Sequence, residues 1–458
     1  MGGAGVASTR GSAAIYWNPA ALAFQKDDGR PPFNIGGGFS VVLGAIGSTM
    51  SDLDRLAKDV QALDVAAIEA KFNSGTQLTE AELRQAVQII TLDLPALVGP
   101  GDGLILDAMA GPSAQWERFG FGVFATIHGG ITANFDFSFL AFGNQGITSA
   151  IGAGNDRSGQ ISTDGQSLAD QLASTGNVTQ NQAEELVFQA EQSGAWSVDP
   201  ATQDALNRLV NTTAANVGGS AANFFTNNQT GGAVHGIFIQ ELATGYGHPI
   251  IPDFLAVGAT FKVMNAITFS SIYSMSQSPE SSELASDIYE LRNTEDTANV
   301  GVDAGALLTP FRWLALGVTG KNLNRPSFDR EGGGHTYLDP TARAGVAFYP
   351  LPFLSLAADM DLYHYQSDVL PGYRSQILGG GASLDFGWIA VQAGLSKNLI
   401  DPEEDTLIHT SLLFQWGYFS LEFAGAVTPN WRAVEFEGGA EVPERAGFAF
   451  SFGFNIPW

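Results

Sequence analysis

The end of the chain alternates strictly between large apolar side chains and small or polar ones. The apolar set occupies every second position and consists of Phe448, Phe450, Phe452, Phe454, Ile456 and Trp458. A period of two places the two sets on opposite faces of a β-strand, and an apolar face opposite a small or polar one is typical of a strand in a membrane barrel. Phe454, Ile456 and Trp458 also resemble the usual outer-membrane insertion signal, since the series ends on an aromatic residue.

The same alternation recurs in the segments 342–348, 354–362, 389–395 and 419–423. In each segment we expect the apolar set to face lipid and the other set to face a lumen. Leu356 and Val391 belong to the first set, and Ser355 and Gln392 to the second. The alternative is a soluble β-sandwich, but a sandwich would more often place long, well-solvated polar residues on its outer face.

Composition supports the membrane barrel. Charged residues make up only 15% of the chain, whereas glycine occurs 55 times and phenylalanine 31 times. No window of 18 uncharged apolar residues exists, so a membrane-spanning helix is not expected. A chain that crosses lipid without helices must form a closed barrel, because only then is every backbone polar group satisfied.

The connections alternate between short and long, as expected for periplasmic turns and external loops. This pattern predicts an all-β barrel of about fourteen antiparallel strands, with both termini on the periplasmic side of a Gram-negative outer membrane. The predicted strands are 33–47, 104–113, 117–135, 231–246, 253–276, 297–308, 312–323, 340–350, 352–364, 374–385, 388–398, 406–415, 418–427 and 444–455.

Two insertions interrupt the β pattern, and both follow strands that run outward, so we expect them outside the cell. In the first, 51–98, apolar residues recur at helical spacing, and Thr79 with Glu82 predicts a capping box. The second, 136–230, is first rich in Gly, Ser and Asn and then shows helical periodicity around 180–192. Asp199 and Pro200 predict the start of another helix.

Several motifs resemble those of the FadL-type outer-membrane transporter superfamily, and most closely its conjugal-transfer TraF-type β-barrel family. The resemblance lies in Gly2-Gly3-Ala4-Gly5-Val6-Ala7, Trp17-Asn18-Pro19-Ala20-Ala21-Leu22, Gly320-Lys321-Asn322-Leu323-Asn324, Leu338-Asp339-Pro340 and Ala393-Gly394-Leu395-Ser396-Lys397-Asn398-Leu399. A thioredoxin-like protein shares the name TraF, but this chain has no cysteine for that chemistry. The abrupt glycine-rich start also suggests that a leader precedes these residues.

The resemblance implies a fourteen-stranded barrel (33–458) with an amino-terminal plug (1–32). Asn18, Pro19 and Ala20 match the plug segment that lies in the lumen. It further implies that hydrophobic substrates leave sideways through a gap in the wall, for which a kink or gap near 117–135 would be evidence. Whether the plug is a permanent cork or a gate stays open.

Strand parity points eight charged side chains into the lumen: Lys262, Asp303, Lys321, Arg343, Asp359, Asp361, Asp385 and Glu422. Unpaired charge is costly away from water, so these groups should pair or be hydrated. One interpretation is a salt-bridge network that anchors the plug. The other is a polar path or carboxylate-binding site that uses Arg343 and Lys262.

Catalytic and ligand signatures are missing from the sequence. It has no nucleotide-binding loop and no zinc-protease or serine-hydrolase motif, its six histidines are scattered, and no cofactor or metal is expected. The net charge of −26 argues against nucleic-acid partners. The expected partners are outer-membrane lipid and the barrel-assembly machinery.

Three hypotheses follow. The first is a passive FadL-like channel for hydrophobic or amphipathic small molecules. The second is a structural or interaction protein whose external helices bind copies of itself, other surface proteins or a conjugation apparatus. The third, a catalytic barrel, has no motif to support it.

Overall fold

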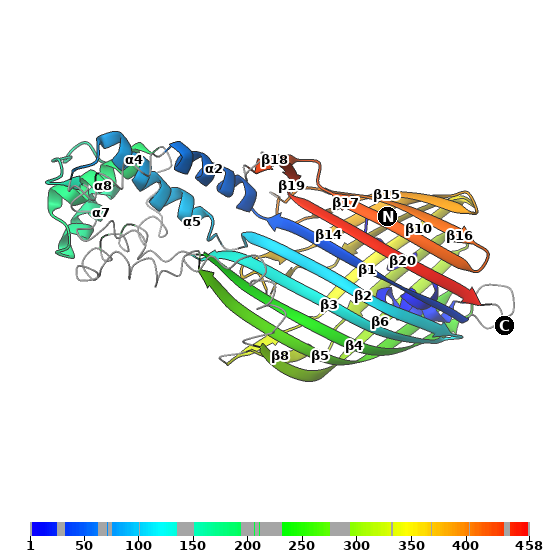
Figure 1. The fold of residues 1–458 in the computed structure, drawn as a ribbon. Coiled ribbons are helices and arrows are strands. Elements are labelled where there is room, and N and C mark those ends of the chain that lie inside the picture. Colours follow the sequence, from blue (N-terminus) through cyan, green and yellow to red (C-terminus); the bar gives the residue numbers. More distant parts are fainter. Residues whose placement is uncertain are drawn as a thin grey trace.

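The computed structural model contains one closed antiparallel barrel (Figure 1). The structure describes residues 2–24, 33–62, 71, 76–99, 101–134, 151–193, 206, 210, 231–274, 294–330, 333–367, 369–402, 404–434 and 440–456. Each barrel strand pairs with the next one along the barrel, and β1 closes the sheet against β20 from Phe33↔Ile456 to Gly44↔Arg445. The sheet therefore has no free edge, which satisfies the condition for crossing lipid with strands.

All fourteen predicted strands are confirmed, with shifts of a few residues at their ends. The barrel strands are β1 (Phe33–Ile46), β2 (Gly103–Trp116), β3 (Phe119–Asn134), β4 (Gly231–Ile251), β5 (Leu255–Ser274), β6 (Thr294–Phe311), β7 (Leu314–Lys321), β10 (Thr341–Leu351), β11 (Leu354–Asp361), β14 (Ile377–Asp385), β15 (Ile389–Asn398), β16 (Leu407–Trp416), β17 (Phe419–Val427) and β20 (Arg445–Ile456). Of the predicted insertion signal, Trp458 lies outside the described residues.

The outer face of the barrel is apolar, and the inner face is closely packed. On β11, Leu356 is 38% exposed and Met360 39%, whereas Asp359 between them is 3% exposed. Aromatic rings gather at the short turns, as in the stack of Phe311 on Trp313. Aromatic rings at the short-turn end match the aromatic girdle of membrane barrels. The apolar residues of each strand thus face lipid, and the residues between them face the lumen.

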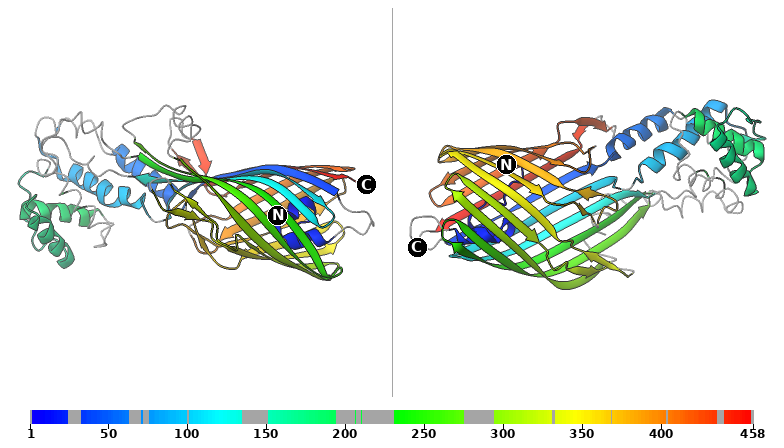
Figure 2. Two further views of the ribbon diagram at one scale, coloured as in Figure 1. Left: turned by 90° about the horizontal axis from the view of Figure 1, so that it is seen from below. Right: turned by 180° about the vertical axis from the view of Figure 1, so that it is seen from behind.

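The amino-terminal segment lies inside the barrel (Figures 1 and 2). It contains η1 (Gly11–Ala13), α1 (Ala14–Trp17) and η2 (Pro19–Ala23). Its alanines pack with inward-facing residues of five strands, among them Ala256, Leu307 and Ala347. Residues 25–32, which complete the predicted plug 1–32, lie outside the described part of the chain.

Helices from both insertions lie beyond the end of the barrel that is opposite the C-terminus (Figure 1). They are α2 (Thr49–Ala62), α4 (Glu80–Gln88), η3 (Ile89–Asp93) and α5 (Leu94–Ala96) from the first insertion, and α7 (Thr163–Ser174) and α8 (Gln180–Gln192) from the second. None of the described helices is long and apolar enough to cross a membrane. The Thr79–Glu82 capping box and the helix at 180–192 are confirmed, α7 was not predicted, and Asp199–Pro200 lies outside the described residues.

The helices of the two insertions share one apolar core, which we call the helical head. Leu83 and Val87 of α4 pack in a single buried cluster with Leu168 of α7 and Leu186 of α8. Arg157 joins the insertions electrostatically, with Nη2 2.9 Å from Glu80 Oε1 and Nε 2.9 Å from Glu185 Oε2. The two external loops are thus connected to each other by both packing and charge.

Two short hairpins that the sequence did not reveal lie at the helical end of the lumen. The first pairs β8 (Ser327–Asp329) with β9 (His335–Tyr337), and the second pairs β12 (Tyr365–Gln366) with β13 (Arg374–Ser375). Phe328 is fully buried against lumenal residues such as Ile237, and Leu370 is fully buried against Ile46 and Ile105. These two loops therefore fold inward. A third hairpin pairs β18 (Trp431–Val434) with β19 (Ala440–Pro443).

Candidate functional site

The Asn18-Pro19-Ala20 segment is fixed to the barrel wall by the Asn18 side chain. Asn18 is fully buried, and its Nδ2 donates to the carbonyl of Val6 at 3.0 Å and to that of Ala306 on β6 at 3.2 Å. Its Oδ1 accepts from the N–H of Ala20 at 3.1 Å and so caps η2, with Pro19 at the first position. One side chain therefore sets the conformation of the segment and holds it to β6.

Asp359 provides a second attachment. Its Oδ2 accepts from the backbone N–H of Gly5 at 2.7 Å and from that of Val6 at 2.8 Å. Its other oxygen is buried without a hydrogen-bond partner among the described residues. Backbone donors thus satisfy one oxygen of this inward carboxylate, which joins the start of the segment to β11.

Inward-facing glycines make room for the backbone of the segment. A Cβ on Gly258 would overlap the backbone of Pro19 and Ala20, and one on Gly379 would overlap the Gly2 carbonyl. Glycine permits such close approach of one backbone to another. The glycines that meet the segment or its Asp359 anchor in this way, which we call the glycine belt, are Gly247, Gly258, Gly305, Gly317, Gly345 and Gly379.

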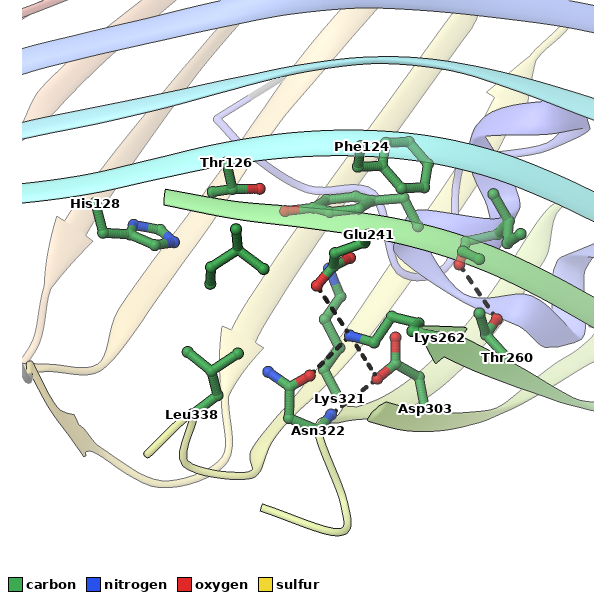
Figure 3. A pocket seen from close by; sticks show the side chains of 14 residues that line it. Phe124, Thr126, His128, Glu241, Thr260, Lys262, Asp303, Lys321, Asn322 and Leu338 are labelled. Atoms are coloured by element: carbon green, nitrogen blue, oxygen red, sulfur yellow. Dashed lines mark hydrogen bonds and ion pairs between the residues drawn. The ribbon is translucent and has the colours of Figure 1, made fainter. Parts of the chain in front are cut away.

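Lys262 lies at the centre of a group of buried charges (Figure 3). Its Nζ is 3.1 Å from Asp303 Oδ1 and 3.5 Å from Glu241 Oε1, and it donates to Asn322 Oδ1 at 2.7 Å. Asp303 also accepts from the N–H of Asn322 at 2.8 Å. The sequence interpretation omitted Glu241, although its parity on β4 already points it inward.

Arg343 forms a separate pair with Asp361, at 2.7 Å from Nε to Oδ1. The other oxygen of Asp361 accepts from the N–H of Ile377 at 2.8 Å. Glu422 accepts from the hydroxyls of Ser411 and Ser451 at 2.9 and 3.3 Å, away from both pairs.

Asp385 does not join these groups, and its assignment to the lumenal network was wrong. It is exposed at the last residue of β14, where it accepts from the N–H of Gly387 in the following turn. Asp385 still pairs with Ala390 in the ladder, but at the end of the strand its side chain bonds to the turn and not to the lumenal charges.

A cavity of about 420 Å³ lies between the inward hairpins and the amino-terminal segment. We call it the outer chamber. Its apolar and aromatic walls include Ile105, Ile237, Leu338, Val369, Tyr16, Trp17, Tyr337, Tyr365 and Tyr373. Lys321 and Arg343 also line it, together with Asp107, whose Oδ1 lies 2.8 Å from Nδ1 of His128 on the neighbouring strand. Its size is typical of sites for small molecules, so the lumen has space for an amphipathic ligand.

A second cavity of about 520 Å³, here the wall cavity, lies on the other side of Tyr16 and Trp17, which line both spaces. Its lining includes the run of Gly36, Gly37 and Gly38 on β1. It extends to Phe39, whose ring is 44% exposed on the outer face of the barrel. The glycines add no side chains to the wall at this point, and the ring of Phe452 lies against Gly37.

The β2–β3 ladder is interrupted beside the wall cavity. Pairing proceeds to Ala110↔Ala125 and resumes at Ser113↔Gly122, which leaves Gly111 unpaired with β3. Pro112, also unpaired there, has no N–H to donate. The register of β2 against β3 is the same on both sides of this break, and β3 pairs with β4 along its whole length, so the kink or gap expected near 117–135 is not seen in β3 itself.

The described residues contain no group of three or more His, Cys, Asp or Glu side chains arranged to hold a metal ion. Tyr16, which lines both cavities, was not singled out from the sequence, and Trp17 was named only as the first residue of the motif that contains Asn18, Pro19 and Ala20. Trp17 precedes the Asn-Pro-Ala motif directly, and this adjacency was the only available signal.

Comparison with known proteins gives one family match and several distant structural similarities. The family described as "F plasmid transfer operon, TraF, protein" matches residues 15–361, and no curated protein matches the chain. The toluene transporter TbuX of Ralstonia pickettii is 11% identical, with a TM-score of 0.46 and coverage of 100% of this chain and 96% of that one. The toluene transporter TodX of P. putida is also 11% identical, with a TM-score of 0.46 and coverage of 100% of this chain and 97% of that one. A FadL homologue of Pseudomonas aeruginosa is 10% identical, with a TM-score of 0.38 and full coverage of both chains. Similarity this weak carries no argument about substrate.

Proposed function

The chain belongs to the family described as "F plasmid transfer operon, TraF, protein", and we propose that it is an outer-membrane channel through which hydrophobic or amphipathic small molecules pass without an energy source. The observation that carries this proposal is the pair of cavities that share Tyr16 and Trp17 in their linings. A solute would enter the outer chamber past the inward hairpins. It would then pass the two rings and reach the wall cavity.

The glycine-lined wall beside the second cavity supports a sideways exit into lipid. The Gly36–Gly38 run carries no side chains to block the way, and the interrupted β2–β3 ladder at Gly111 and Pro112 removes hydrogen bonds that would resist opening. An apolar solute moving from the chamber to the outward ring of Phe39 would stay out of water, so its own concentration gradient would drive it.

The glycine belt and Asn18 favour a fixed cork at the Asn18-Pro19-Ala20 segment. Movement would then be confined to Tyr16 and Trp17, which face the cavities. In this arrangement the segment directs solute toward the wall.

Uptake of phenylnaphthylamine, a dye that fluoresces in the cell envelope and is excluded by an intact lipopolysaccharide leaflet, tests the channel. Cells that express the chain should take up the dye faster than cells with an empty vector, and Trp17→Ala should raise the rate further by widening the passage. Leu242→Ala, on the lipid face, is the matched control. Uptake at the vector rate by cells containing folded barrel would exclude the channel.

The helical head favours a second function, contact between copies of the chain. A head with its own apolar core and an Arg157 link between its two loops is larger than a passage for solutes requires. The molar mass of the chain in lipid nanodiscs, measured by light scattering, tests this. A dimer that Arg157→Ala converts to a monomer would support contact through the head, and a monomer at all concentrations would exclude it.

A further inference from the structure

Three cations line the lumen between the inward hairpins and the amino-terminal segment, and two of them are already neutralised. Lys262 is held by Asp303 and Glu241, and Arg343 is held by Asp361. These are the two residues that the sequence suggested for carboxylate binding. Their charges are therefore used within the protein and are not available to a ligand.

Lys321 differs from both. It forms no ion pair with any described residue, and the one contact of its Nζ is with the ring of Tyr16, 3.3 Å from the ring centroid. Cation–π contact stabilises an ammonium group only partly when the group is removed from water. The acidic groups nearest in the fold, Asp303 and Glu241, are engaged by Lys262 (Figure 3).

The position of Lys321 connects it to the outer chamber. Its side chain lines this chamber and also the smaller cavity around Lys262. The chamber lining also includes the Tyr16 ring that Lys321 contacts, the ring of Trp17 and the apolar side chain of Leu338.

The chamber lining also holds Arg343, Asp107, Asp339 and Asp361. Each of these is paired, Arg343 with Asp361, Asp107 with His128 and Asp339 with Arg325. Lys321 is therefore the lining cation without an ion pair among the described residues, and beside Tyr16, Trp17 and Leu338 it matches a molecule with one anionic group and an apolar body.

We infer that Lys321 anchors small amphipathic anions in the outer chamber. A carboxylate of the solute would accept a charge-assisted hydrogen bond from Nζ, while an aromatic or aliphatic body lies along Tyr16, Trp17 and Leu338. This inference rests on the proposed channel and specifies the class of solute that it holds. The bound carboxylate would lie beside Tyr16 and Trp17, whose rings line both cavities. The site is therefore at the point of the proposed passage where a solute would leave the outer chamber.

Calorimetric titration of the full chain in lipid nanodiscs with phenylbutyrate and phenylbutanol tests the inference. The two probes share one apolar body and differ in charge. The wild type should bind phenylbutyrate about tenfold more tightly or better, as expected for a hydrogen bond to a charged group. Lys321→Met should remove this preference and leave phenylbutanol binding unchanged, whereas Lys321→Arg should retain it.

Lys397→Met is the matched control, because Lys397 is exposed near the end of β15 and lines neither cavity. A preference that survives Lys321→Met, or that Lys397→Met removes equally, would overturn the inference. Equal binding of the two probes by the wild type would also overturn it while leaving the channel intact. Dye uptake remains a separate measurement, so the channel can fail or stand independently.

Discussion

Asp359 on β11 accepts a 2.7 Å hydrogen bond from the backbone N–H of Gly5, across 354 positions of the chain. This contact and its neighbour at Val6 hold the start of the amino-terminal segment to the barrel wall. The carboxylate is buried, so the strength of the attachment depends on these donors.

Replacement of Asp359 should release this part of the segment. Hydrogen bonds to charged groups contribute about 1.5–3 kcal/mol each, so Asp359→Ala should raise the hydrogen-exchange rates of the Gly5 and Val6 amides about tenfold or more. Asp359→Asn keeps an acceptor oxygen and should retain most of the protection. Asp385→Ala, in an exposed turn, serves as control. Unchanged exchange in Asp359→Ala would show that the Asn18 contacts and the glycine belt hold the segment without Asp359.

A side chain on the glycine belt should displace the segment. Gly258→Ala would place a methyl group where the backbone of Pro19 and Ala20 now lies. To make room, η2 would have to shift away from β5 and break the hydrogen bond by which Asn18 caps it. We expect faster proteolysis within residues 2–24 and increased dye uptake, with the barrel intact. Gly425→Ala meets nothing within 4 Å and should behave as the wild type. Equal behaviour of the two variants would contradict the close fit.

A charged substitution on the lipid face should lower the stability of the barrel. Leu356→Arg or Val391→Arg should cost about 2–4 kcal/mol where the position lies at the bilayer midplane, because an arginine there must be removed from water. Ser355→Arg and Gln392→Arg, which face the lumen, should cost much less. Urea titration of folding into lipid vesicles measures the difference. Equal losses at both sets of positions would be incompatible with the outward assignment.

The base of the first insertion should be sensitive to pH through Asp93. Burial raises the pKa of Asp93 from its usual 3.8 to about 6, and this outweighs the 2.7 Å pair with Arg55. The folded state therefore binds the proton more tightly than the unfolded state. Stability is highest below about pH 4 and falls as the pH rises through about 6.

Hydrogen exchange in α2 and η3 between pH 4 and 7.5 would reveal this dependence, expected as faster exchange at the higher pH after correction for intrinsic rates. Asp93→Asn should flatten the profile. Asp54→Asn, on the exposed side of α2 and paired only with Lys58, should leave the profile in place. A flat profile in the wild type would refute the assignment.

The barrel could be predicted from the sequence because every lipid-facing strand position must be apolar. Each strand must present apolar residues outward, and segments such as 448–458 keep that alternation throughout. The same parity points Lys262, Asp303, Arg343 and Asp361 inward, and in the structure these residues line cavities and form two ion pairs. Which charges pair was not readable, because pairing depends on strand register and on Asn322, which follows the end of β7.

Features that lie outside the alternation were missed. The two inward hairpins have only two or three residues per strand, too few for a period to be seen. α7 lies in a stretch rich in Gly, Ser and Asn, where its buried Leu168 and Leu172 are few. Asp385 was misplaced because it is the last residue of β14, where its side chain is exposed and accepts from the N–H of Gly387 in the turn.

The position of residues 2–24 inside a ring that closes between β1 and β20 constrains how the molecule can be made. The segment precedes β1 in the chain, yet it lies against strands as late as β15. The wall that surrounds it is therefore completed only after most of the polypeptide exists. Enclosure of the segment and joining of the first strand to the last are one event, so a chain that closed early would be left with an empty interior.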